Sequence, residues 1–200
     1  MIRLIESNRA CRIIVAHESW IRVVSQRYSV PVPVIEAILY KEMIAIDLVD
    51  VLADLTVLAG LPFKRDSSTG YAQIFGRVGL AAANFAVDRG LATYESLGIP
   101  CPHRLNPANR EDVRTVWKKL YTDTKANIEL ATINLLVAAD EVIGRTDFAT
   151  FSADELKRVL SRYNANVRHV TSYGEDAYRA YEAFAASWNQ GHMPARSARA

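Results

Sequence analysis

Apolar residues recur three or four positions apart along most of this chain, which is the spacing of helices with one buried face. Turn-forming residues separate the periodic segments. Almost no stretch alternates apolar and polar residues as a strand would. The chain is therefore predicted to be all-α, or nearly so. The expected helices lie within residues 2–28, 33–59, 73–89, 110–121, 124–143, 152–163 and 175–188.

Several helix boundaries have a local chemical signal. Pro33 is suited to the first position of a helix. Asn106 or Asn109 is expected to cap the helix at about 110, and Ser152 with Glu155 forms a capping box. No strong breaker occurs between 33 and 59, so this stretch is one bent helix or two. Its three aspartates, at 47, 50 and 54, are expected to form a solvated acidic face.

Glu42 is an acidic residue at a position where the helical period predicts a buried side chain. At about 100° per residue it lies within an apolar stripe, whereas Glu36 and Lys41 are predicted on other faces. A carboxylate that faces a core is costly unless it is paired or protonated, and a general acid must be protonated near neutral pH. Glu42 is therefore either a candidate acid or the partner of an arginine such as Arg77 or Arg162. The stripe comprises Ile35, Ile38, Leu39 and Ile46.

A polar turn follows about twenty residues later. It runs from Asp66 through Ser-Ser-Thr-Gly-Tyr-Ala-Gln to Ile74, and several of its residues favour turns. Ser68 and Gln73 supply hydrogen-bonding side chains, and Tyr71 supplies an aromatic ring. Glu42 and this turn together form a site hypothesis.

Composition and charge exclude several classes of protein. The 200 residues include 50% hydrophobic and 23% charged residues, which is globular composition, and the formal charge of +2 does not indicate a nucleic-acid partner. The N-terminal stretch is interrupted by charges, so neither a signal peptide nor a transmembrane span is predicted. We expect synthesis in the cytoplasm without a classical signal. No phosphate-binding loop or serine or cysteine nucleophile signature is present, and no cofactor is predicted.

The cysteines and histidines give no metal-ligand pattern. Cys11 and Cys101 are expected to be two free buried thiols, although one bridge between them stays open. The four histidines share no short spacing, and no cysteine or acidic cluster is expected to join them. No metal site is therefore predicted. The histidines are His17, His103, His169 and His192.

Three segments in order resemble the lysozyme-like superfamily, specifically soluble lytic transglycosylases and goose-type lysozymes. They are the helix with its glutamate, the Ser-Ser-Thr-Gly-Tyr-Ala-Gln-Ile turn, and Arg-Tyr-Asn-Ala-Asn near 164; the stretch from Asn127 to Ala131 also looks like a buried helix of that family. The resemblance covers roughly residues 33 to 185. It implies a helical domain with an active-site cleft. The family roles carry over to Glu42 as catalytic acid, to Ser68, Gly70 and Gln73 as cleft residues, and to Tyr163 and Asn164 near the acid.

The resemblance implies cleavage of the β-1,4 bond between N-acetylmuramic acid and N-acetylglucosamine in peptidoglycan. An inverting hydrolase needs a second carboxylate to activate water, for which Asp66 is the candidate and Asp47 a weaker one. A lytic transglycosylase instead uses the sugar's own 6-hydroxyl group. We expect hydrolysis, but the residues leave both routes open. For Tyr163, core packing is an alternative to a role beside the acid.

The predicted organisation is an N-terminal helical extension (1–32), a catalytic domain (33–188) and a flexible tail (189–200). Such an enzyme would reach the wall as a phage lysin or as a delivered antibacterial toxin, the latter with an immunity protein as partner. Lys-Glu-Met in place of the family's Glu-Ser, and Asn166 in place of a glycine, motivate a second hypothesis. It is a catalytically inactive helical binding or structural domain.

Overall fold

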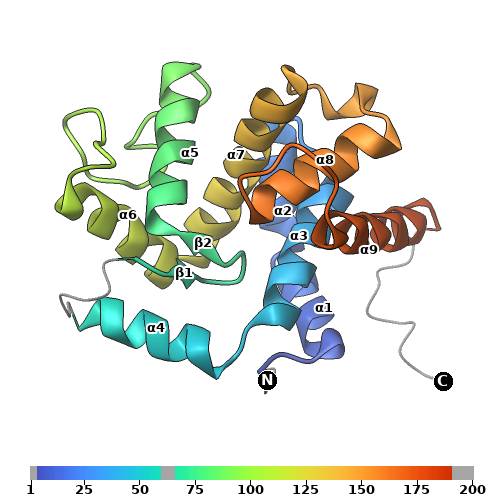
Figure 1. The fold of residues 1–200 in the computed structure, drawn as a ribbon, viewed down its shortest axis with the longest axis horizontal. Helices are drawn as coiled ribbons and strands as arrows, with labels where there is room; N and C mark the ends of the chain where they lie inside the picture. The colour runs from blue at the N-terminus through green and yellow to red at the C-terminus, as the bar shows by residue number, and fades with distance from the viewer. Residues whose placement is uncertain (1–3, 60–65, 191–200) are drawn as a thin grey trace. The chain divides into compact units, whose positions relative to one another are not determined.

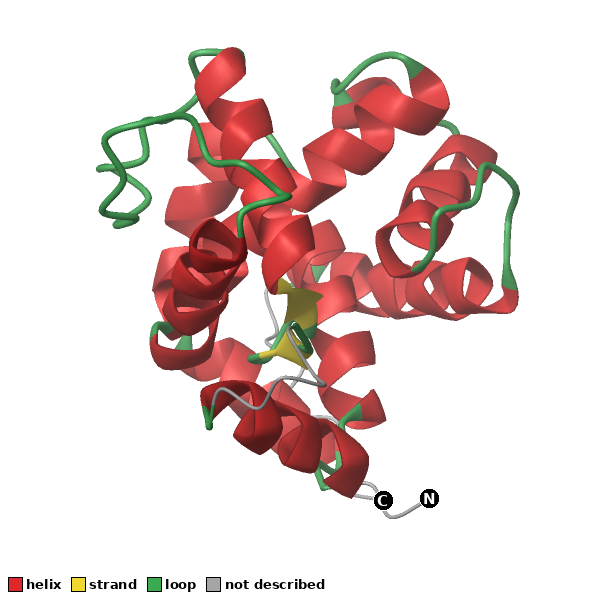
Figure 2. Ribbon diagram, turned by 60° about the vertical axis from the view of Figure 1, so that its left-hand side comes forward, coloured by secondary structure: helices red, strands yellow, loops and turns green. Residues whose placement is uncertain are grey.

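Most of the apolar-periodic segments are helices in the computed structural model, which describes residues 4–59 and 66–190. Figure 2 shows how little of this part of the chain is extended. The prediction of a nearly all-α protein is confirmed. Among the described residues, no helix combines the length and apolar character needed to cross a membrane. The helices, labelled in Figure 1, are α1 (Ser7–Ala16), α2 (Glu18–Tyr28), α3 (Val32–Ala45), α4 (Leu48–Leu58), α5 (Gly76–Asp88), α6 (Arg110–Thr122), α7 (Thr124–Ile143), the short 3₁₀ helix η1 (Phe148–Thr150), α8 (Ala153–Asn164) and α9 (Ser172–Asn189).

The chain packs as two compact units. The middle unit comprises Leu4 and Ala45–Asn134, and the terminal unit comprises Ile5–Ile44 and the chain from Leu135 onward. Residues 5–32 of the predicted N-terminal extension thus pack in the same unit as α8 and α9. Residues 191–200, most of the predicted tail, lie outside the described residues.

The predicted boundaries are mostly close to the observed ones. The capping box of Ser152 and Glu155 is confirmed, Asn109 rather than Asn106 caps α6, and residues 124–143 form one long helix as predicted. The stretch from 33 onward is two helices, α3 and α4, and α3 begins at Val32, one residue before Pro33. The last helix begins at Ser172 because Thr171 caps it by accepting the N–H of Gly174 at 3.2 Å.

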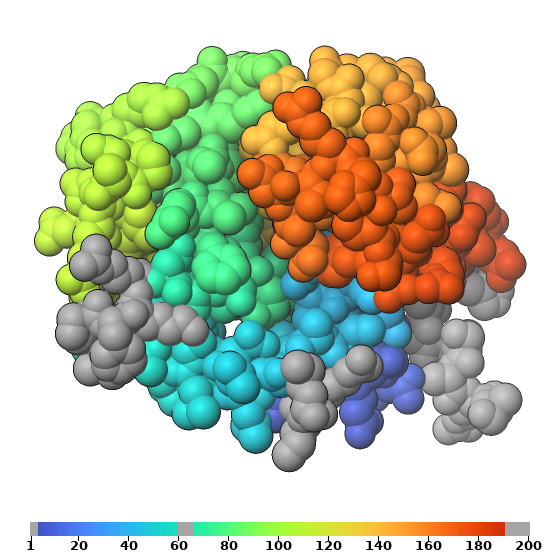
Figure 3. All heavy atoms as spheres, viewed as in Figure 1, coloured from blue at the N-terminus to red at the C-terminus, as the bar shows by residue number. Residues whose placement is uncertain are grey.

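The prediction of a solvated acidic face on α4 is wrong. Asp47 and Asp50 form a capping box at its N-terminus, and Asp54 accepts hydrogen bonds from the hydroxyl groups of Ser67 and Thr69 at 2.6 and 2.8 Å. The three carboxylates are thus engaged in hydrogen bonds within the protein. The exposed face of α4 consists of aliphatic side chains instead. Atoms of α4 lie on the surface drawn in Figure 3, and the exposed aliphatic residues of this helix are Leu48, Val49, Val51, Leu52, Leu55 and Leu58.

The middle unit contains a short hairpin that the sequence did not predict. Strand β1 (Ser68–Thr69) pairs antiparallel with β2 (Ile74–Phe75), with Thr69 opposite Ile74. The helix expected from Gln73 therefore begins only at Gly76. Helices α5 and α6 lie side by side in Figure 1, and a Cβ atom at Gly79 would come within 2.8 Å of Leu120 Cδ1. Glycine thus permits the close packing of α5 on α6.

In the terminal unit, helix α3 is buried on nearly every side. Its buried residues include both glutamates, so Glu36, which was expected on a different face from the apolar stripe, is buried as well. The helical period of 100° per residue identifies a single buried stripe only when the opposite face of the helix is exposed to solvent, and α3 has no such exposed face. The buried residues of α3 are Val34, Ile35, Glu36, Ala37, Ile38, Leu39, Glu42 and Met43.

Candidate functional site

The carboxyl group of Glu42 is held by a tyrosine in the terminal unit. Glu42 is 8% exposed on α3, and the hydroxyl group of Tyr173, in the first turn of α9, donates a hydrogen bond to its Oε1 atom. Burial, the charge of Glu42 and this hydrogen bond raise the pKa of Tyr173 well above its ordinary value. Tyr173 therefore stays protonated and remains a hydrogen-bond donor to Glu42.

A glycine beside Tyr173 allows α9 to start close to α8. A Cβ atom at Gly174 would lie 2.0 Å from Ser161 Oγ and 2.6 Å from the carbonyl oxygen of Lys157. Ser161 Oγ also accepts the N–H of Thr171 at 2.9 Å. This close approach fixes the first turn of α9, and with it the position of Tyr173.

Tyr163 also lies near Glu42. Its side chain is buried on α8, and burial together with the charge of Glu42 raises its pKa well above the ordinary value. Asn164, the last residue of α8, is exposed. Arg162, one of the arginines considered as a partner for Glu42, forms an ion pair with Glu141 at 2.5 Å.

Glu36 is the most completely buried carboxyl group of α3. Its exposed fraction is 0%, its Oε2 atom accepts the indole N–H of Trp188 at 2.8 Å, and its Oε1 atom has no hydrogen-bond partner among the described residues. Burial raises the pKa of Glu36 to about 7, although the Trp188 hydrogen bond lowers it. A substrate cannot reach this group without unfolding, so Glu42 is the better candidate for an acid.

A pocket of about 450 Å³ lies beside α3 in the same unit. Glu42 is not among its lining residues, although its neighbour Lys41 is, and Lys41 pairs there with Asp176 at 3.1 Å. Cys11 also lines this pocket; burial and the charge of Glu36 raise the pKa of its thiol. The carboxyl group of Glu42 and this pocket are therefore separate features.

The predicted polar turn belongs to the middle unit, where Asn127 of α7 holds it in place. Asn127 Oδ1 accepts the N–H of Ala72 at 2.9 Å, and its Nδ2 donates to the carbonyl oxygen of Thr69 at 3.0 Å. Gly70 has φ +71°, and a Cβ atom there would lie 2.3 Å from Asn127 Nδ2. A residue with a side chain would therefore be strained at position 70 and would collide with Asn127.

The other predicted turn residues are partly exposed, and one of them, Gln73, forms a hydrogen bond within the turn. Gln73 has φ +42°, and its Nε2 atom donates to the carbonyl oxygen of Gly70 at 2.9 Å. Ser68 is in β1 and Tyr71 is in the turn itself. The structure thus brings Ser68, Gly70, Tyr71 and Gln73 together within one short turn, and it brings Tyr163 and Tyr173 to Glu42 within the other unit.

Asp66 caps helix α5. Its Oδ1 atom accepts the N–H of Gly76 at 2.7 Å, and its Oδ2 atom accepts the N–H of Arg77 at 3.0 Å. Burial raises the pKa of Asp66 above its ordinary value, although both hydrogen bonds lower it. Each oxygen of this carboxyl group therefore has a structural partner.

Sequence reasoning missed two residues of these sites and one side-chain cluster. Tyr173 lies just before the predicted helix 175–188 and has no sequence signal of its own, and Asn127 is predicted only as part of a buried helix. The argument that no cysteine or acid joins a histidine is contradicted, because the fold brings Cys101 and Asp112 to His103. Both cysteines are free and half-buried.

Comparisons of the chain with models of known protein families, with curated proteins and with solved structures find no match. Functional inference therefore depends on the residues and on their geometry.

Asn127→Ala is expected to lower the free energy of unfolding by about 2–4 kcal/mol, because it leaves a buried N–H and a buried carbonyl group unpaired and opens a cavity. Urea unfolding measures the change. Asn166→Ala, at an exposed position, serves as the control and should change the stability little. Equal stability of the two variants would contradict the role of Asn127 as the residue that holds the turn.

Proposed function

We propose that this protein is a peptidoglycan-cleaving glycosidase with a lysozyme-like active-site cleft. It cuts the β-1,4 bond between N-acetylmuramic acid and N-acetylglucosamine, with Glu42 as the general acid. The observation that carries the proposal is the environment of Glu42, a nearly buried carboxyl group hydrogen-bonded to Tyr173 and close to Tyr163. The sequence resemblance independently selects Glu42 and expects a tyrosine near it.

The chemistry requires a positioned carboxylic acid. Glu42 protonates the glycosidic oxygen as the bond to the leaving sugar breaks. The hydrogen bond from Tyr173 fixes the orientation of the carboxyl group before the substrate arrives. The turn from Ser68 to Gln73, which Asn127 holds in place, offers polar and aromatic groups for sugar binding.

For the second step we infer the transglycosylase route, in place of the hydrolysis expected from the sequence. Both carboxylate oxygens of Asp66 accept backbone N–H groups at the start of α5, which is a helix-capping arrangement. A base that activates water becomes protonated in each cycle, and the loss of its charge would weaken this capping. Attack by the sugar's own 6-hydroxyl group needs no second carboxylate, because the Glu42 carboxylate left by the first step takes the hydroxyl proton, and the product is a 1,6-anhydro end.

Asp66→Asn is expected to be less stable than wild type by about 1–3 kcal/mol, because one of its side-chain atoms becomes an NH₂ donor that faces a backbone N–H. At a temperature where the variant remains folded, its cleavage rate should stay within a few-fold of wild type. Mass spectrometry should find 1,6-anhydro ends in both digests. Reducing ends, together with loss of activity in folded Asp66→Asn, would instead establish Asp66 as the base of a hydrolase.

The activity itself is tested by clearing of purified peptidoglycan. Walls of several chemotypes are incubated with the wild-type protein, and turbidity is followed over time. Clearing of at least one wall type is expected. A folded protein that binds walls and clears none of them would favour the inactive binding domain.

A further inference from the structure

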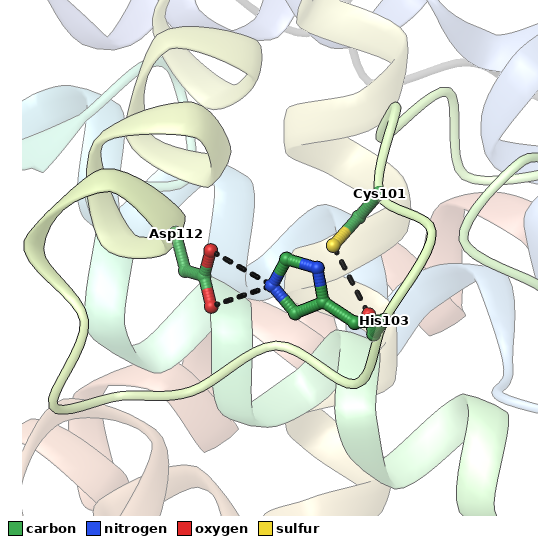
Figure 4. A group of neighbouring side chains, drawn as sticks. All are labelled: Cys101, His103 and Asp112. Atoms are coloured by element: carbon green, nitrogen blue, oxygen red, sulfur yellow. Dashed lines mark hydrogen bonds and ion pairs between the residues drawn. The ribbon is translucent and has the colours of Figure 1, made fainter.

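Three side chains with metal-ligating atoms meet in the middle unit, away from the residues discussed so far. Cys101 and His103 belong to the loop between Gly98 and Asn109, and Asp112 lies in the first turn of α6. The thiol sulfur, a ring nitrogen of His103 and a carboxylate oxygen of Asp112 all lie within 4.8 Å of one another. Figure 4 shows the imidazole ring between the other two side chains.

Hydrogen bonds already hold these groups in place. Asp112 is 7% exposed, and its Oδ2 atom accepts the N–H of Asn106 at 2.7 Å. His103 Nε2 lies 3.3 and 3.4 Å from the two oxygens of Asp112. The thiol group of Cys101 donates to the carbonyl oxygen of His103 at 3.0 Å. A backbone N–H that orients a ligating carboxylate is a common feature around metal ions in proteins.

We propose that Cys101, His103 and Asp112 form a binding site for Zn²⁺. Thiolate sulfur with imidazole nitrogen and one carboxylate oxygen is a donor set that suits zinc, whereas Mg²⁺ and Ca²⁺ prefer oxygen alone. Three protein ligands leave a fourth tetrahedral position for water. The side chain of His103 is 56% exposed, so this position is open to solvent.

Small side-chain movements suffice to close the site. With zinc bonds of roughly 2.0–2.3 Å, the ligand atoms of a tetrahedral site lie roughly 3.3–3.8 Å apart. The present separations of up to 4.8 Å are within about 1.5 Å of that geometry. Pro100, Pro102 and Pro107 restrict the backbone of this loop, which reduces the conformational entropy lost when the ligands converge.

Binding changes the protonation of the site in a defined way. The Cys101 thiol loses its proton to solvent, and the resulting sulfur lone pair bonds to the ion. His103 binds as the neutral ring through Nε2, with its proton on Nδ1, and Asp112 binds ionised. Binding therefore releases protons, and affinity falls as the pH is lowered. The bound ion joins the 98–109 loop to α6.

Cobalt is the probe that reports thiolate ligation directly. The full-length protein, reduced and freed of metal with a chelator, is titrated with Co²⁺ and then with Zn²⁺. Wild type should bind one equivalent of Co²⁺ and show a thiolate-to-cobalt charge-transfer band in the near ultraviolet. Zn²⁺ should displace the bound Co²⁺ and abolish this band. Cys11→Ser is the matched control, since it removes the only other cysteine, and it should behave as wild type.

Cys101→Ser should lose the charge-transfer band and bind Zn²⁺ at least about 100-fold more weakly, because it removes a direct ligand rather than an outer-shell partner. His103→Gln, at an exposed side chain, provides a second variant that leaves the core intact. Zn²⁺ should raise the melting temperature of wild type and of Cys11→Ser, but not of the other two proteins. Absence of the band in wild type, or its persistence in Cys101→Ser, would overturn the proposal.

Discussion

Glu42→Gln is expected to cleave purified peptidoglycan about 10²–10⁴-fold more slowly than wild type, which is the usual contribution of a general acid. Glutamine retains an oxygen that can accept the Tyr173 hydroxyl group, so the local hydrogen bond survives. It has no proton to give to the glycosidic oxygen at neutral pH. The rate of turbidity loss at equal concentrations of folded protein measures the effect.

Glu36→Gln is the matched control for this substitution. It makes the same chemical change at a buried position of the same helix, six residues earlier. Because Glu36 is fully buried and bonded to Trp188, its replacement should leave the cleavage rate within a few-fold of wild type. Equal losses in the two variants would mean that disruption of α3, rather than removal of an acid, explains the result.

The same control variant should change how stability depends on pH. The pKa of Glu36 is raised from 4.5 to about 7 in the fold, so its ionised form is disfavoured there. Wild type therefore loses stability as the pH rises from about 4.5 to about 7, and the loss levels off above that range. Glu36→Gln should be more stable than wild type by up to about 3 kcal/mol at pH 8, with no such gain at pH 4.5.

Chemical denaturation of both proteins across this pH range measures the difference. Glu182→Gln, at an exposed position of α9, is the reference for replacing a carboxyl group and should track wild type. A stability difference between Glu36→Gln and wild type that does not vary with pH would contradict the raised pKa. So would a stability advantage of Glu36→Gln over wild type that is smaller at pH 8 than at pH 4.5.

The helical period predicted the architecture well because it reports local structure. Residues 124–143 form one helix, and Ser152 with Glu155 caps α8, as their patterns indicated. The helical period alone did not predict that both glutamates of α3 are buried. A helix that is buried on nearly every side has no exposed polar face that would mark the remaining positions as buried. The period therefore could not show that Glu36 is buried.

Contacts between distant segments explain the remaining errors. Asp54 was expected in water, yet its partners Ser67 and Thr69 follow 13 and 15 residues later. Tyr173 lies 131 residues from Glu42, and Asn127 lies 55 residues from Ala72. Cys101 and His103 approach Asp112 only because a proline-rich loop returns to α6. Neither the helical period nor the spacing of motifs along the chain predicts such contacts.

The identity of the bond that is cut tests the central claim most directly. Purified peptidoglycan is digested with wild type and with Glu42→Gln, and the soluble fragments are separated and identified by mass spectrometry. The proposed chemistry predicts fragments from wild type alone, in which every new C1 end is N-acetylmuramic acid in its 1,6-anhydro form and every new non-reducing end is N-acetylglucosamine. N-acetylglucosamine at the new C1 ends, cleavage confined to the peptide stems, or equal digests by the two proteins would contradict it.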